Sequence, residues 1–256
     1  MGARRDASRP RRAARAVASA LTFAAPLASS TAVALATLFF TPRAVYAQRT
    51  VPVHQEPRHR LLHEVGSLKV LDVQILPGDT TLFHVHATPI TYVTIGTSST
   101  DSRSLGGDWS NAVPRNPPPG TVGAVRAVTS YADAPLTHQV TNIGSTLFRL
   151  IAVPNMGPGA EGEATGPMPG EVVDDSRWFR WRRVTLAPGQ ATEWHTAGAP
   201  IAAVAIRGDR TWVDRRDAWA STLARSGDVG VLEAGAGYRI RNTGTAEAEV
   251  VLVEVR

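Results

Sequence analysis

Two histidines one residue apart, His84 and His86, stand in the otherwise largely apolar stretch LPGDTTLFHVHATPITYVTIG (76–96). Short runs of Val, Ile, Thr and Phe are typical of β-strands, in which residues two apart point to the same face. Two imidazoles on one face of a strand can hold one cation if the fold supplies a third ligand. The same neutral pair can also be buried with hydrogen bonds alone, so this stretch by itself leaves both interpretations open.

The second half of the chain contains a counterpart of this stretch that lacks the second histidine. Residues 187–207, APGQATEWHTAGAPIAAVAIR, align with residues 76–96 so that Pro-Gly, His and Pro-Ile coincide, and His195 takes the place of His84. Further along, HQVTNIG (138–144) aligns with YRIRNTG (238–244), and apolar alternation follows both. Two landmarks in the same order indicate an internal duplication.

Short apolar runs broken by Gly, Pro, Asn and Asp dominate both halves, which predicts an all-β protein built as a sandwich or barrel. The segment between the halves is rich in Pro and Gly and reads as a linker. We therefore expect a signal segment at 1–47, an N-terminal arm at 48–67, one barrel at 68–153, the linker at 154–176 and a second barrel at 177–256.

The charge distribution argues against a nucleic-acid partner. Residues 1–47 hold seven of the 27 basic residues and one of the 22 acidic ones, which leaves 20 basic and 21 acidic residues in 48–256. A nearly neutral body has no need to bind phosphates. The chain has no cysteine, so disulfides and thiolate ligands are excluded, and any metal must be held by His, carboxylate or amide groups.

The first 47 residues resemble an export signal: an arginine-rich start, apolar stretches, and small residues before a plausible cleavage site after Ala47. Pro26 and several Ser and Thr residues interrupt the apolar part, which makes it a poor membrane span. We expect a protein that is exported to the periplasm or the exterior of a bacterium and has no stable membrane span after cleavage. An uncleaved N-terminal membrane anchor is the alternative.

The pattern Gly78-x5-His84-x-His86, followed by His138-x3-Asn142, resembles the two motifs of the cupin superfamily. The resemblance covers the core of both halves and implies a bicupin, with two tandem double-stranded β-helix (jelly-roll) barrels. It implies that His84, His86 and His138 are metal ligands that point into the first barrel. The glutamate of the family's first motif would fall near Ile90 or Thr91 and is missing here, so the implied site has three neutral imidazoles and no carboxylate.

A site of this kind is similar to those of cupin dioxygenases that hold ferrous iron with three histidines. Fe²⁺ is therefore the first expectation, with Zn²⁺, Mn²⁺ or Ni²⁺ as alternatives. Without a carboxylate the metal keeps its full charge, which favours a chelating or anionic small-molecule substrate. Thr91 would face the position of the missing glutamate. The long loop at 97–121 offers Arg103, Asp108, Trp109 and Arg115 for substrate contacts.

The second barrel has lost this ligand set, because Ala197 and Tyr238 stand at the positions of His86 and His138. We interpret it as a degenerate barrel, in which Trp194, His195 and Tyr238 are candidates for a metal-free pocket. His59 and His63, in the arm, are expected to be solvated.

Three functions remain open at this stage. They are an exported metalloenzyme, either dioxygenase-like or a lyase or isomerase; a non-catalytic module that binds a metal or small molecule; and a structural bicupin that forms homodimers through its edge strands.

Overall fold

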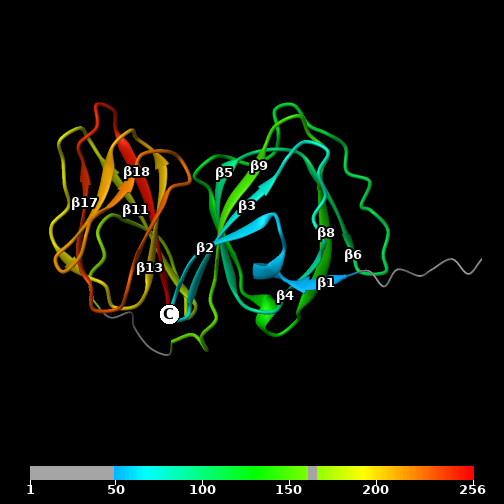
Figure 1. The fold of residues 1–256 in the computed structure, drawn as a ribbon, viewed down its shortest axis with the longest axis horizontal. Coiled ribbons are helices and arrows are strands. Elements are labelled where there is room, and N and C mark those ends of the chain that lie inside the picture. The colour runs from blue at the N-terminus through cyan, green and yellow to red at the C-terminus, as the bar shows by residue number, and fades with distance from the viewer. Residues whose placement is uncertain (1–48, 161–165) are drawn as a thin grey trace, which may run out of the picture. The chain divides into compact units, whose positions relative to one another are not determined.

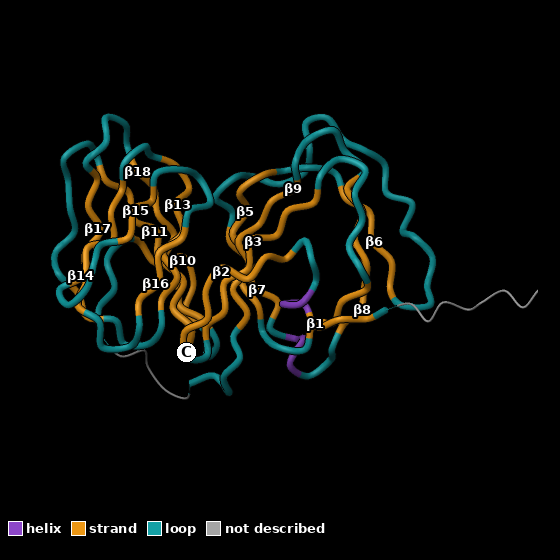
Figure 2. The backbone as a smooth tube through the Cα atoms, in the orientation of Figure 1, coloured by secondary structure: helices purple, strands orange, loops and turns teal. Residues whose placement is uncertain are grey.

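Two β-barrels, one from each half of the chain, account for most of residues 49–160 and 166–256, the part of the chain that the computed structural model describes (Figures 1 and 2). Barrel 1 contains β1 (Thr50–Pro52), β2 (His59–Val65), β3 (Leu68–Ile75), β4 (Phe83–His86), β5 (Ile90–Gly96), β6 (Thr100–Ser104), β7 (Val125–Val128), β8 (Leu136–Asn142) and β9 (Phe148–Pro154), with the 3₁₀ helices η1 (Val53–Gln55) and η2 (Ser130–Ala132). Barrel 2 contains β10 (Glu171–Asp175), β11 (Phe179–Leu186), β12 (His195–Thr196), β13 (Ile201–Arg207), β14 (Thr211–Arg215), β15 (Ser221–Leu223), β16 (Val229–Leu232), β17 (Gly237–Asn242) and β18 (Ala248–Val255).

Each barrel is made of a four-stranded and a five-stranded sheet. In barrel 1 the strand orders are β1-β4-β8-β6 and β2-β3-β9-β5-β7, and in barrel 2 they are β12-β17-β14-β15 and β10-β11-β18-β13-β16. Neighbours that are distant in sequence, such as β4 and β8, show that the strands cross between sheets as in a jelly roll. The metal-ligand candidates lie on the four-stranded sheet of barrel 1.

The central strands of the five-stranded sheets are buried on both faces, which explains apolar sequences such as those of β9 and β13. Along β13 the side chains alternate: Ile201 and Ala203 belong to the interior of barrel 2, whereas Ala202 and Val204 belong to a core shared with barrel 1. From barrel 1 the shared core takes Leu68, Val70, Val93, Ile95, Ile151 and Val153. A sheet that is covered on both sides needs no polar face.

Polar contacts accompany this shared core. Trp181 Nε1 donates a hydrogen bond to Thr91 Oγ1 at 3.2 Å, and Asn155 Nδ2 donates one to the carbonyl of Arg256 at 2.8 Å. Thr91 is fully buried and faces barrel 2. The prediction that Thr91 faces the metal site is therefore wrong.

The same turn recurs in both barrels, as the aligned landmarks predict. Gly78 and Gly189 adopt φ angles of +78° and +79°, which glycine reaches without strain, and their N–H groups bond to the carbonyls of Asn142 and Asn242. Both asparagines are fully buried. The side chain of Asn142 donates to the carbonyls of Ile75 and Thr146 at 2.8 Å each; Asn242 makes the equivalent pair of bonds at 3.0 and 2.9 Å.

Replacing Asn142 by alanine is expected to lower the free energy of unfolding by about 3 kcal/mol, because it leaves buried carbonyls without a donor. Asn242→Ala should cost a similar amount. Asn142→Asp keeps the oxygen that accepts from the Gly144 amide but loses the donors, so it should remain destabilised. Urea unfolding measures all three variants. A change below about 1 kcal/mol in both alanine variants would show that these bonds do not fix the turns.

Two predicted boundaries need correction. The arm at 48–67 is not separate: β1 pairs in parallel with β4, and β2 pairs with β3 in antiparallel fashion, so both strands complete barrel 1. The linker at 154–176 includes β10, which pairs with β11 and so belongs to barrel 2. Both segments are short and polar, so their sequences do not look like strands. Strands at the edge of a sheet can nevertheless be polar, because they need few apolar residues.

The expected signal segment at 1–47, with its cleavage site, lies outside the described residues. Within the described ranges the structure contains no helix with the length and apolar character needed to cross a membrane.

Candidate metal centre

Strand pairing brings three histidines together inside barrel 1. His84 and His138 are direct cross-strand partners on β4 and β8, and His86 lies two residues beyond His84 on the same face. One ligand atom from each of the three lies within 4.8 Å of those of the other two. The structure therefore assembles the set that the motif resemblance implied.

The spacing of the ring nitrogens suits a shared metal ion. His86 Nε2 and His138 Nε2 are 3.1 Å apart. Two nitrogens bound at about 2.1 Å to one ion, at octahedral or tetrahedral angles, lie about 3.0–3.4 Å apart. A hydrogen bond between the two rings also fits this distance, provided that one nitrogen carries the proton.

Hydrogen bonds orient the ligand rings. His84 Nδ1 lies 3.0 Å from the carbonyl of Leu82, which can only accept, so Nδ1 carries the proton and Nε2 keeps its lone pair. His86 Nδ1 lies 3.3 Å from the hydroxyl of Tyr92. When Nδ1 donates to this hydroxyl, Nε2 of His86 is likewise left with a lone pair. Such partners on the far side of the ring fix both tautomer and orientation.

Burial keeps these imidazoles neutral at pH 7. Burial, with a smaller effect from neighbouring His84, lowers the pKa of His86 to about 2 and that of His138 to about 4. The pKa of His84 is also lowered by burial, although its bond to Leu82 and the carboxylate of Glu56 oppose the shift. Neutral imidazoles are the form that binds metals.

A fourth histidine, His59 on β2, packs against the cluster, and sequence reasoning missed it. It is only 5% exposed, so the expectation of a solvated side chain is wrong. Its ring centroid is 4.6 Å from that of His84, and its Nδ1 donates to the carbonyl of Val53. The clue was the Gly66-Ser67 pair, because two such residues between apolar runs predict a hairpin that places 59–65 in the barrel sheet.

The histidines line one cavity of ≈ 210 Å³. Most of the remaining lining is apolar, from Val53, Val73, Ile75, Ile90, Val140, Phe148, Leu150 and Ala152; Tyr92, Tyr131, Arg126, Thr100 and Ser102 complete it. No aspartate or glutamate is among the described residues of this lining. The cavity thus combines an apolar body with a cluster of nitrogen donors.

The loop at 97–121 contributes less than expected. Arg103 donates to Gln139 at 2.9 Å and lies over the rings of Phe83 and Trp109. Neither Arg103 nor Asp108, Trp109 or Arg115 lines the cavity. The loop reaches it only through Thr100 and Ser102, because alternate residues of β6 face opposite sides of the sheet.

Barrel 2 reproduces the register of the site without its ligands. His195 pairs with Tyr238 across β12 and β17, as His84 pairs with His138, and the two rings are 5.9 Å apart. Tyr238 is fully buried, and no described residue bonds to its hydroxyl. Trp194 is 36% exposed, and the guanidinium groups of Arg216 and Arg239 both lie over its ring. A pocket formed by Trp194, His195 and Tyr238 stays a prediction.

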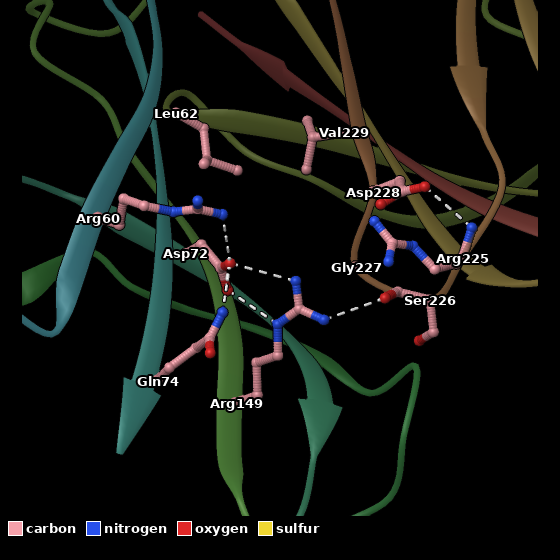
Figure 3. A pocket seen from close by; sticks show the side chains of 10 residues that line it. All are labelled: Arg60, Leu62, Asp72, Gln74, Arg149, Arg225, Ser226, Gly227, Asp228 and Val229. Atoms are coloured by element: carbon pink, nitrogen blue, oxygen red, sulfur yellow. Dashed lines mark hydrogen bonds and ion pairs between the residues drawn. The ribbon is translucent and has the colours of Figure 1, made fainter. Parts of the chain in front are cut away.

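A larger cavity, of ≈ 380 Å³, lies where the barrels meet (Figure 3). Its buried carboxylate, Asp72, accepts hydrogen bonds from Arg60, Gln74 and Arg149, and Arg149 also donates to the carbonyl of Ser226 in barrel 2. Burial acts to raise the pKa of Asp72, but these bonds together outweigh it and hold the pKa below its usual value. Asp72 thus holds Arg149, and Arg149 in turn connects the two barrels through its bond to Ser226.

A scan of the sequence against protein-family models gives no match, and a search of the curated proteins gives none either. Solved structures do match the fold. AerE from Microcystis aeruginosa aligns with a TM-score of 0.56 at 10% identity, over 80% of this chain and 96% of AerE. A salicylate 1,2-dioxygenase from Pseudaminobacter salicylatoxidans gives 0.52 at 9% identity, over 78% of this chain and 77% of that enzyme.

A cupin 2 conserved barrel domain protein from Leptotrichia buccalis gives a TM-score of 0.47 at 10% identity, over 77% of this chain and 88% of that one. At these identities the similarities concern the fold alone. The strand order and the two matches with TM-scores above 0.5 confirm the predicted fold class: an all-β protein with two tandem double-stranded β-helix (jelly-roll) barrels.

Proposed function

We propose that the protein is a metal-dependent enzyme that acts on a small chelating or anionic molecule, with His84, His86 and His138 as the metal ligands. The observation that carries this proposal is the histidine cluster, whose ligand atoms lie within 4.8 Å of one another at a cavity large enough for a small molecule. Neutral imidazoles with oriented lone pairs are what a divalent cation requires.

We propose Fe²⁺ as the metal and dioxygenation as the reaction. Bound there, Fe²⁺ would supply oxygen chemistry, whereas Zn²⁺, Mn²⁺ or Ni²⁺ would supply the Lewis acidity of a lyase or isomerase. The shared fold with a salicylate 1,2-dioxygenase supports the oxidative choice.

A non-catalytic module that binds a metal or small molecule is the second candidate. It is favoured by the lining of the cavity, in which the described residues include no carboxylate to act as a general base.

The remaining proposals rest on the sequence. Residues 1–47 direct export to the periplasm or the exterior of a bacterial cell, or else anchor the chain in the membrane. The chain is a bicupin whose second barrel is degenerate and supports the first, and edge strands pair two chains into a homodimer.

Elemental analysis of the protein recovered from the periplasmic fraction should find about one divalent ion per chain, and N-terminal sequencing of that sample should begin at Gln48. Oxygen uptake with a panel of small hydroxycarboxylates then separates the two candidates, because only a dioxygenase consumes oxygen with its substrate. If a small molecule binds without turnover under every metal tested, the non-catalytic module is favoured. If the protein holds no metal after incubation with each ion, the metal-dependent enzyme is contradicted and only a module that binds a small molecule is left.

A further inference from the structure

Arg126 is held at the cavity by strand register. It lies on β7 directly opposite Tyr92 on β5, so the two side chains share one face of the sheet. Its Cζ atom is 4.6 Å from the centroid of the Tyr92 ring. Tyr92 in turn contacts His86, and both Arg126 and Tyr92 line the cavity.

No carboxylate among the described residues pairs with the guanidinium of Arg126. Several other arginines of barrel 1 do pair with carboxylates, as Arg58 does with Asp79 and Arg149 with Asp72. Among the described residues, none accepts a hydrogen bond from the guanidinium of Arg126 or forms an ion pair with it. A guanidinium over an aromatic ring, without an acid, is ready to pair with an outside anion.

The residues that line the cavity carry one formal positive charge and no negative one. Its histidines are neutral, no described lining residue is acidic, and Arg126 is the only arginine or lysine among the described lining residues. A divalent ion on the histidines would add two more positive charges. Between Arg126 and the histidines the lining of the cavity is apolar and includes Ile75, Ile90 and Leu150. The volume of the cavity is smaller than the roughly 300 Å³ or more that is typical for drug-sized ligands.

From these observations we infer that Arg126 anchors a carboxylate of the substrate. The substrate class is a small, largely apolar carboxylate that carries a second oxygen donor for the metal. A guanidinium matches a carboxylate with two parallel N–H···O bonds, which fixes the orientation of the molecule toward the histidines. This inference rests on the proposed function and adds to it the residue that selects the substrate.

Salicylate, an apolar ring with adjacent carboxylate and hydroxyl groups, is a suitable probe, and its neutral amide, salicylamide, is the matched comparison. Binding of both is measured by titration calorimetry on the full chain loaded with Zn²⁺. The wild-type protein should prefer salicylate. Arg126→Gln should weaken salicylate binding about 10- to 100-fold and remove the preference over salicylamide, and Arg126→Lys should lie between the two.

Arg103→Gln is the matched control, since Arg103 also lies over aromatic rings but outside the cavity. It should bind salicylate as the wild type does. Metal content and thermal midpoint are measured for every variant, and Arg126→Gln should keep both. The inference is overturned if Arg126→Gln retains its metal and binds salicylate as tightly as the wild type, or if the wild type does not bind salicylate at millimolar concentration. Absence of metal from the wild type overturns instead the proposed function.

Discussion

Alanine at His84 or at His138 is expected to abolish metal binding. These two residues face each other across β4 and β8, and together with His86 they are the described side chains that offer clustered ligand atoms. Removing one leaves two imidazoles, and the lining offers no carboxylate to replace the third. Loss of an outer-shell partner alone weakens metal binding about 10- to 100-fold, so loss of a ligand should exceed 100-fold and leave almost no ion after dialysis.

His195→Ala is the control for this prediction. It removes the histidine at the equivalent register position of barrel 2, where the cross-strand partner is Tyr238, and it should leave the metal content at the wild-type value. Elemental analysis and competition with a chromogenic chelator measure stoichiometry and affinity for each variant. Equal metal in the wild type and in both barrel 1 variants would disprove the assignment of the ligands.

Acid is expected to destabilise the metal-free protein strongly between about pH 6.5 and pH 4. Burial lowers the pKa of His59 to about 3, of His86 to about 2 and of His138 to about 4. Below pH 6.5 these residues take up protons in the unfolded chain but not in the folded one, so the free energy of unfolding falls as pH falls. Each contributes up to about 1.4 kcal/mol per pH unit. Three together reach about 4 kcal/mol per unit, which is a large part of a typical stability of about 5–15 kcal/mol.

Urea unfolding of the metal-free protein near pH 7.5, 6 and 5 measures this dependence. His86→Leu removes one of the three groups and should flatten the slope below pH 6 by about a third. The metal-loaded protein should resist acid further, because a ligand that binds only the folded state stabilises it. Equal stability near pH 7.5 and pH 5 would contradict the prediction.

The sequence predicted the features that repeat or that follow a spacing rule. Asn142 and Asn242 could be aligned because the same buried turn is built twice, and His84, His86 and His138 followed from strand periodicity and the motif resemblance. Strand periodicity gave a wrong prediction for Thr91, because the position of the strand was uncertain by one residue. A shift of one position in a strand exchanges its two faces, and so Tyr92, rather than Thr91, faces the cavity.

Other site residues depend on pairing between distant segments, which a single sequence does not reveal. His59 belongs to the cluster because β2 joins the sheet beside β3. Arg126 stands between Val125 and Ala127, both of which pack against the shared core. When one face of a strand packs against a core, as Val125 and Ala127 do, the other face usually points to solvent. Only closure of the barrel turns that face toward the histidines.

Because the two barrels share one core, we expect the two halves to fold as a single cooperative unit. A fragment that ended after β9 would expose Leu68, Val70, Val93 and Ile151, which in the whole chain are almost fully buried against barrel 2. An apolar patch of this kind favours self-association over a soluble monomer. Barrel 2, which lacks the histidine cluster, thus covers the apolar face of the barrel that has it, and neither half is expected to melt without the other.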